Sequence, residues 1–310
     1  MSLFNSSYKF LTPKKVKKIK LFLCILPFII FVFIFFYFPL FGWVYAFFDY
    51  RPGVPLNRQQ FTGLLFFKLM FSGTSGILLV LRNTLAMSFL NILSSPVPVI
   101  FAILLTEAKS KYFTRIVQTI TSIPNFISWV LVYSIFFTFL SSNEGVINAW
   151  LLKAGIISMP LDILGNNKWA WINQLFIGLW KGTGWGAIIY FAAITSIDSE
   201  LYDAAEVDGC NRWQKIMNVT VPGIMPTFFV LLMLSISNML SNGFEQFWVF
   251  QNPMTLDKLE VLDTYIYRLG IYKGEISFST AMGALKSIVS IILLTFANTL
   301  SKKIRGSSVF

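Results

Sequence analysis

The feature of this chain that most constrains its fold is an apolar run at residues 21–48, LFLCILPFIIFVFIFFYFPLFGWVYAFF. A helix needs about 20 consecutive apolar residues to cross the hydrocarbon core of a bilayer, and this run exceeds that length. It is also too long for the core of a signal peptide and shows no convincing small-residue cleavage site. We therefore expect a retained first membrane span, tilted or bent near Pro27 and Pro39.

Similar apolar stretches recur along the whole chain, which indicates an all-α polytopic membrane protein. The composition agrees, because 55% of the residues are hydrophobic and only 13% are charged, far from the balance of a soluble domain. The fourth stretch is the most diluted, since it contains Lys181 and several glycines. The six expected spans are 21–48, 77–105, 115–140, 170–195, 226–250 and 279–300.

Basic residues flank the first and last spans, and this placement explains the net charge of +11. Lysines cluster within residues 1–20, and three basic residues lie within 302–305. Loops on the same side as the termini carry more Lys and Arg than the alternate loops, so the positive-inside rule places both termini in the cytoplasm. We expect a basic cytoplasmic N-terminus at 1–20, a single transmembrane domain at 21–310, and no nucleic-acid partner.

The chain contains no histidine, which removes the commonest general base and the commonest metal ligand. Its two cysteines, Cys24 and Cys210, are expected at different depths, so we expect no disulfide. A clear paired-carboxylate or nucleophile–base motif is also missing from the sequence, which makes a membrane-embedded glycosyltransferase or protease a poor interpretation. We expect no enzyme activity, no metal site and no cofactor bound by this chain.

The fourth and fifth spans are separated by a polar segment, DAAEVDGCNRWQKIMNVTVP, that favours a short helical hairpin. Asp198 or Ser199 can cap its first helix, and Gly209 is a natural left-handed stop. Asn211 can cap a second short helix, which Pro222 would end. These residues alone leave an equal alternative, a loop that merely packs against the span ends.

The spacing within this segment resembles the EAA loop of ATP-binding-cassette (ABC) importer permeases. The pattern of that loop is Glu-Ala-Ala, three residues, Gly, nine residues, and Ile-x-Leu-Pro. Here Asp replaces Glu and Val replaces Ile and Leu, while every spacing is kept. The resemblance implies that 196–225 is a cytoplasmic coupling loop, whose helix seats in a groove of an ATPase subunit. The implied coupling residues are Asp203, Ala204, Ala205, Glu206, Gly209 and Pro222.

The resemblance extends over nearly the whole chain, to the oligosaccharide and polysaccharide branch that includes the aldouronate-type systems of Gram-positive bacteria. It implies six spans of the type I ABC importer permease in a bacterial plasma membrane, with the coupling helix between spans four and five. The matching stretches are PLFGWVYAFFDYRP (39–52), LRNTLAMS (81–88), SIPNFISWVLV (122–132), LWKGTGWGAIIYFAAITSIDSELYDAAEVDG (179–209), GFEQFWVFQNP (243–253) and DTYIYRLG (263–270).

The same resemblance implies the partners. They are a second, similar permease, two ABC ATPase subunits that hydrolyse ATP with Mg, an extracellular substrate-binding lipoprotein, an oligosaccharide substrate and membrane lipid. We expect this subunit to move a complex oligosaccharide by alternating access, with no ATPase site of its own. The segment KGTGWG at 181–186 agrees, because it lacks the strand and the Gly-Lys-Ser/Thr ending of a phosphate-binding loop. Its glycines are expected to serve close helix packing or bending.

Two polar stripes are candidates for the substrate path. Four residues of span five recur at spacings of three, four and three, which is one helical face, and such a face should look into the protein or a wet cavity. Three residues of span three recur at steps of four and offer an amide and aromatic faces to a sugar. Interhelical hydrogen bonds and ordinary membrane aromatics are the alternatives. The candidates are Ser235, Asn238, Asn242, Glu245, Asn125, Trp129 and Tyr133.

A rival interpretation is an ion-coupled secondary sugar transporter that uses Glu245 as its proton carrier. It does not explain the EAA spacing, and we see no convincing inverted repeat. Three basic residues, Arg82, Lys181 and Lys286, lie in or near spans, where snorkelling to an interface accounts for each of them. Lys286 and Glu245 could also pair across the interior.

Overall fold

The computed structural model describes residues 13–72, 76–108 and 110–305. In these residues the secondary structure is helical apart from one isolated antiparallel bridge between Phe48 and Phe61. The prediction of an all-α fold is confirmed. Residues 1–12 of the predicted basic N-terminus lie outside the described residues.

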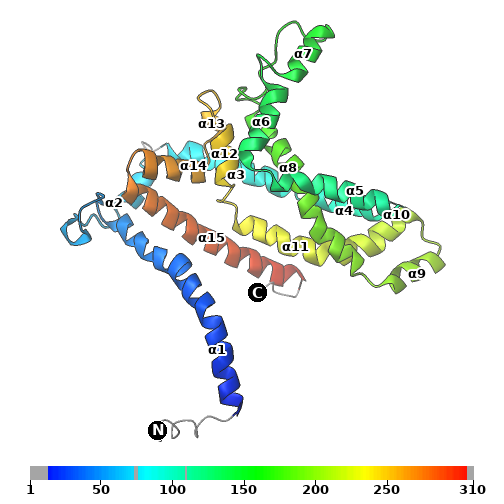
Figure 1. The fold of residues 1–310 in the computed structure, drawn as a ribbon, viewed down its shortest axis with the longest axis horizontal. Coiled ribbons are helices and arrows are strands. Elements are labelled where there is room, and N and C mark those ends of the chain that lie inside the picture. Colours follow the sequence, from blue (N-terminus) through cyan, green and yellow to red (C-terminus); the bar gives the residue numbers. More distant parts are fainter. Residues whose placement is uncertain (1–12, 73–75, 109, 306–310) are drawn as a thin grey trace, which may run out of the picture.

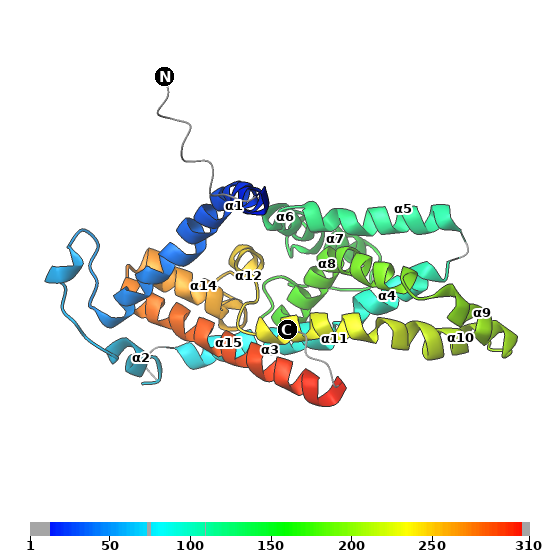
Figure 2. The same cartoon turned by 90° about the horizontal axis from the view of Figure 1, so that it is seen from below.

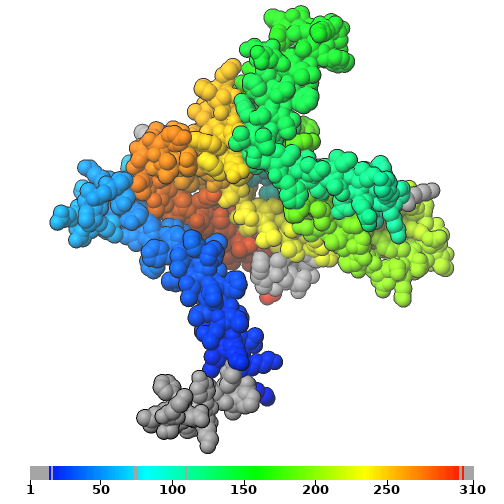
Figure 3. Space-filling model, viewed as in Figure 1, coloured from blue at the N-terminus to red at the C-terminus, as the bar shows by residue number. Residues whose placement is uncertain are grey.

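The first apolar run forms a continuous helical rod that projects from the rest of the molecule (Figures 1 and 3). None of its most apolar stretch is buried. Pro27 stays inside the α-helix, whereas Pro39 stands near the start of the final 3-10 segment, where the helix geometry changes. The rod consists of α1 (Pro13–Val32), a π-helical turn (Phe33–Tyr37) and a 3-10 helix (Phe38–Phe47).

The second and third spans differ in continuity. The second runs from Ile77 to Thr106, while the third bends by 106° at a short break. The predicted third span, 115–140, is therefore not one continuous helix: Pro124 lacks an N–H and disfavours helix in the residue before it, and Ser128 caps a new helix. The elements are a short 3-10 turn (Leu56–Arg58), α2 (Leu65–Met70), α3 (Ile77–Leu93), α4 (Pro96–Thr106), α5 (Lys111–Ser122), a 3-10 turn (Ile123–Phe126), α6 (Trp129–Leu140) and α7 (Val146–Lys153).

The predicted fourth span, 170–195, coincides with one helix, α8 (Ala170–Thr195). After it come the two short helices of the polar segment, of which the second continues without interruption into the fifth span. Pro222 does not end the second helix: a π-helical turn precedes it, and this wider geometry accommodates a proline within a continuing helix. The elements are α9 (Ser199–Val207), α10 (Arg212–Lys215), the π-helical turn (Ile216–Thr220) and α11 (Val221–Ser237).

The predicted fifth span at 226–250 is interrupted. α11 ends at Ser237, and a new helix begins only after Gly243, whose φ of +89° lies in the region that favours glycine. The last predicted span, 279–300, lies within one long helix. The remaining elements are α12 (Phe244–Phe250), α13 (Leu256–Leu259), α14 (Leu262–Tyr267), a π-helical turn (Arg268–Tyr272) and α15 (Ile276–Arg305).

By length and hydropathy, four helices of the described residues can cross a membrane, or five if the bent pair counts as one span. α8 has the length but not the hydropathy, because it carries polar residues and glycines. In the body of the molecule α4 packs against α8 and α11 packs against α15. The hairpin of α9 and α10 lies at one end of this body, and α2 lies at the opposite end (Figures 1 and 2).

Candidate functional site

Two hollows of about 350 Å³ each lie among the broken spans, and Asn91 of α3 lines both. The first hollow lies between α3 and the end of α11, and most of the side chains that line it are amides and hydroxyls. The second hollow lies between α8 and the break before α6. Five of the seven predicted path residues line them. The first hollow contains Ser235, Asn238 and Asn242 together with Ser88, and the second contains Asn125 and Trp129 together with Lys181 and Gln246.

The other two candidates lie elsewhere. Tyr133 belongs to a hydrophobic cluster and meets Phe250 edge to face, with ring centroids 5.1 Å apart. Glu245 lies in the first turn of α12 and lines neither hollow. The prediction that four residues of span five share one helical face is wrong, because the helix stops at Ser237.

Asn242 anchors the break between α11 and α12 to α3. Its side-chain amide donates to the carbonyl oxygen of Thr84 at 2.8 Å, and the hydroxyl of Ser88 donates to its Oδ1 at 2.6 Å. Its backbone N–H donates to a carboxylate oxygen of Asp263 at 3.2 Å. The non-helical backbone of this break therefore has polar partners inside the protein, which is what backbone within a membrane requires.

The basic residues in the spans are held internally, and snorkelling is not needed to explain them. Arg82 donates to the carbonyl oxygen of Asp257 at 2.9 Å. Lys286 forms an ion pair with Asp263, so the suggested pairing of Lys286 with Glu245 is wrong. Asn83, which follows Arg82 in the sequence and is fully buried, donates to two carbonyl oxygens of the segment after α12.

Lys181 is the basic residue closest to the hollows, because it lines one of them. Its ammonium donates to the carbonyl oxygens of Pro124, Asn125 and Ile127 at 2.9, 2.9 and 2.6 Å. Sequence reasoning missed this role. The available signal was a lysine in the middle of an apolar helix, which in a membrane normally has a specific partner.

The polar segment after α8 forms the predicted helical hairpin. The carboxylate of Asp198 accepts from the N–H of Glu200 at 3.0 Å and caps α9. Gly209 has a φ of +77°, and two bonds close the helix end: Gly209 N–H to Glu206 oxygen at 3.0 Å and Cys210 N–H to Ala205 oxygen at 2.9 Å. This is the Schellman arrangement, which makes a sharp and well-defined turn.

The second limb of the hairpin is braced against the first. Asn211 and Gln214 form a reciprocal capping box at the start of α10. Lys215 reaches the carboxylate of Glu206 at 2.6 Å, and this hydrogen bond and charge lower the pKa of Glu206. Arg212 forms an ion pair with Glu107, at the end of α4.

The implied coupling residues differ in exposure. Asp203, Ala204 and Glu206 are exposed, whereas Ala205 is only 9% exposed and Gly209 lies at the tip. Val207 is an apolar side chain that is 88% exposed. The hairpin therefore presents an outward face and packs its other face against the body, where Tyr202 and Thr220 share a hydrogen bond of 3.0 Å between their hydroxyls.

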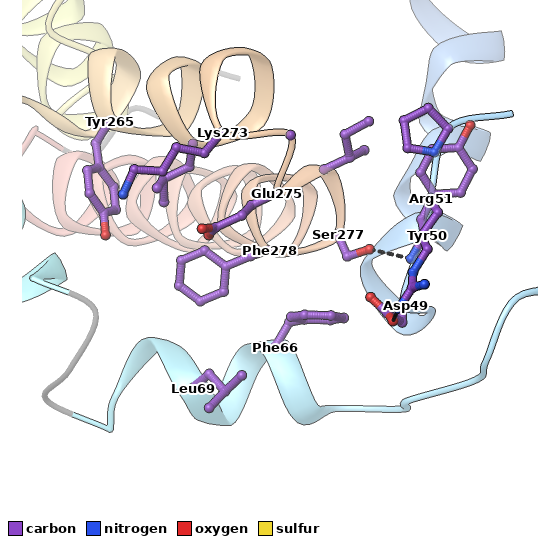
Figure 4. A pocket seen from close by; sticks show the side chains of 14 residues that line it. Asp49, Tyr50, Arg51, Phe66, Leu69, Tyr265, Lys273, Glu275, Ser277 and Phe278 are labelled. Atoms are coloured by element: carbon purple, nitrogen blue, oxygen red, sulfur yellow. Dashed lines mark hydrogen bonds and ion pairs between the residues drawn. The ribbon is translucent and has the colours of Figure 1, made fainter.

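A third hollow of about 510 Å³ lies beside α2 (Figure 4), at the end of the molecule away from the hairpin (Figure 1). Charged residues of both signs line it beside aromatic rings, and the Ser277 hydroxyl accepts from the backbone N–H of Tyr50 at 2.8 Å. Sequence reasoning did not foresee this hollow, because it is assembled from distant segments. Its lining includes Asp49, Arg51, Phe66, Tyr265, Lys273 and Glu275.

Membrane-length helices, amide-lined hollows and a braced polar hairpin define a polytopic membrane protein of the transport class. The chain belongs to the family of binding-protein-dependent transport system inner membrane components, whose sequence pattern matches residues 94–306. The predicted relationship to ABC permeases for sugars is confirmed by the relatives below.

Two relatives come from Bacillus subtilis (strain 168). Protein LplB is 36% identical over 94% of this chain and 91% of its own length. The polygalacturonan/rhamnogalacturonan transport system permease protein YteP is 37% identical over 97% of this chain and 94% of its own length.

The fold is also similar to solved structures. A bacterial ABC transporter involved in the import of the acidic polysaccharide alginate contains a chain that is 35% identical, with a TM-score of 0.84 over 94% of this chain and 98% of that chain. A bacterial alginate ABC transporter in complex with alginate pentasaccharide-bound periplasmic protein gives 34% identity and a TM-score of 0.85, over 96% of this chain and 99% of that chain.

Proposed function

We propose that this chain is a permease subunit that imports a complex oligosaccharide by alternating access, driven by separate ATPase subunits. The observation that carries this proposal is the hairpin at 199–215, which lies in the segment that keeps the EAA spacing and is braced by caps, a Schellman turn and the Lys215–Glu206 contact. A stiff exposed helix joined to spans on both sides can convert movement of an ATPase into movement of the membrane walls.

The substrate class follows from the chemistry of the two hollows. Amides and hydroxyls hydrogen-bond to sugar hydroxyls, and the ring of Trp129 offers an apolar face to sugar C–H groups. The relatives are named as transporters of polygalacturonan/rhamnogalacturonan and of alginate, which supports an oligosaccharide. The path residues in this proposal are Asn125, Trp129, Ser235, Asn238 and Asn242.

The remaining subunits complete the transporter. A second permease and membrane lipid cover the apolar surface of α1, two ABC ATPase subunits hydrolyse ATP with Mg beneath the hairpin, and a substrate-binding lipoprotein delivers the sugar from outside. The complex lies in the bacterial plasma membrane with both termini of this chain in the cytoplasm. This chain contributes no ATPase site.

The test is uptake by the complete transporter in proteoliposomes, with a panel of labelled alginate, galacturonate and arabinose oligosaccharides. We expect uptake of one class that requires ATP and the binding lipoprotein and survives collapse of the proton gradient. Uptake that stops with the gradient and ignores ATP would overturn the proposal in favour of the ion-coupled alternative with Glu245.

A further inference from the structure

The break between α5 and α6 leaves backbone carbonyls without helical partners. The chain bends there by 106°, and residues 123–126 form a 3-10 turn followed by the extended Ile127. Unpaired carbonyls within a membrane are costly because no water is available to hydrogen-bond them, so such a break needs partners from the protein.

Lys181 binds three carbonyls of this break, of which that of Pro124 also accepts from the N–H of Ile127 at 3.2 Å. An ammonium has three N–H donors, and all three are used here, on Pro124, Asn125 and Ile127. The residue is only 8% exposed, and its ammonium lies 5.3 Å from the centre of the Trp129 ring. The ammonium therefore has no hydrogen-bond donor left for a sugar, although it lines the hollow.

Gly184 lies three residues after Lys181, on the same face of α8, and it packs closely against the broken span. A Cβ at this position would lie 2.1 Å from the carbonyl oxygen of Thr121 and 2.8 Å from the backbone nitrogen of Ser122. The α8 backbone therefore packs directly on the end of α5. By contrast, a Cβ at Gly182 would have nothing within 4 Å.

We propose that Lys181 is a positioning residue, which together with Gly184 clamps the broken span and thereby aims Asn125 and Trp129 into the hollow that they share with Gln246. Lys181 and Gly184 of the KGTGWG segment form this clamp. Its effect on sugar selection rests on the proposed function, whereas the clamp itself does not.

The clamp is tested without any substrate. The complete transporter is prepared in nanodiscs with Cys24→Ala and Cys210→Ser, and nitroxides are placed at the exposed Thr119 and Thr138, one on each side of the bend. Double electron–electron resonance then measures the distance between the two labels. We expect a single narrow distance in the parent, and its loss in Lys181→Met and Gly184→Ala.

The matched control is Gly182→Ala, which should keep the parent distance. If Lys181→Met fails to enter the membrane, Lys181→Gln is measured instead, because it keeps two N–H donors without the charge, and it should give a broadened distribution. A parent-like distance in either Lys181 variant would overturn the clamp.

Uptake of the transported oligosaccharide supplies the second measurement. Loss of positioning should raise KM about tenfold in Lys181→Met, the scale of one hydrogen bond lost between the sugar and the displaced Asn125. Lys181→Arg, which keeps donors and charge, should recover part of the affinity. A transporter with the predicted distances but no sugar uptake would refute the proposed function and leave the clamp intact.

Discussion

The side-chain amide of Asn242 donates to the carbonyl oxygen of Thr84 across 2.8 Å, although the two residues are 158 positions apart in the sequence. The bond ties the interrupted fifth span to α3. Ser88 adds a second bond to the same amide group. One side chain therefore fixes the geometry of the hollow that Asn238 and Ser235 line.

Asn242→Leu should destabilise the protein, because it keeps the approximate volume but removes two hydrogen bonds to buried residues of α3. We expect a loss of about 1–3 kcal/mol in the free energy of unfolding, measured as a lower midpoint temperature of the complex in nanodiscs. Ser235→Ala is the control, since its hydroxyl bonds only within its own helix, to Leu231. An unchanged midpoint for Asn242→Leu would contradict the anchor.

Local features of the hairpin could be predicted from the sequence. The caps at Asp198 and Asn211 and the left-handed turn at Gly209 depend on residues within one helical turn, so the residue types alone indicate them. The long apolar runs predicted the helices for the same reason. The continuation of the helix through Pro222 was missed, because the π-helical turn that permits it has no clear sequence signal.

The two broken spans could not be predicted in full. Hydropathy treats a span as continuous, and the partners that make a break tolerable lie far away: Thr84 for the segment at Asn242 and Lys181 for the segment at Asn125. A lysine that snorkels and a lysine that binds three carbonyls are identical in sequence. Only the packing of α8 beside the break distinguishes them.

Gly209→Pro should separate ATP hydrolysis from uptake. Proline cannot adopt a φ of +77° and has no N–H to donate to Glu206, so the turn between α9 and α10 is lost while the spans remain. We expect normal amounts of the variant in the membrane, retained ATPase activity and little or no oligosaccharide uptake.

The control is Gly155→Pro. Gly155 also has a positive φ, and its N–H also donates a hydrogen bond to the end of the helix before it, which is α7. It should reduce uptake much less, because α7 lies outside the hairpin. Normal uptake by Gly209→Pro would count against the coupling role of the hairpin.

The contact between Lys215 and Glu206 should weaken in acid. The folded state lowers the pKa of Glu206, so its contribution is present above the unfolded pKa and is lost as the pH falls through the lower folded value. A nitroxide on the native Cys210, in a Cys24→Ala background, should therefore become more mobile only below about pH 4.5. Glu206→Gln should abolish this transition, and a transition that persists in Glu206→Gln would assign it to another group.

Cross-linking tests where the hairpin faces. Val207 is 88% exposed at the end of α9, and an exposed apolar side chain at a helix end is a good candidate for contact with a partner protein. Val207→Cys, with Cys24→Ala and Cys210→Ser, should cross-link to an ATPase subunit of the complete transporter, and bound ATP should change the yield as the subunits move. Trp150→Cys on α7, which is also exposed, should give no such product.

If an impermeant maleimide added outside intact cells labels Val207→Cys, the hairpin faces away from the ATPase, and both the coupling role and the cytoplasmic placement of the termini are wrong.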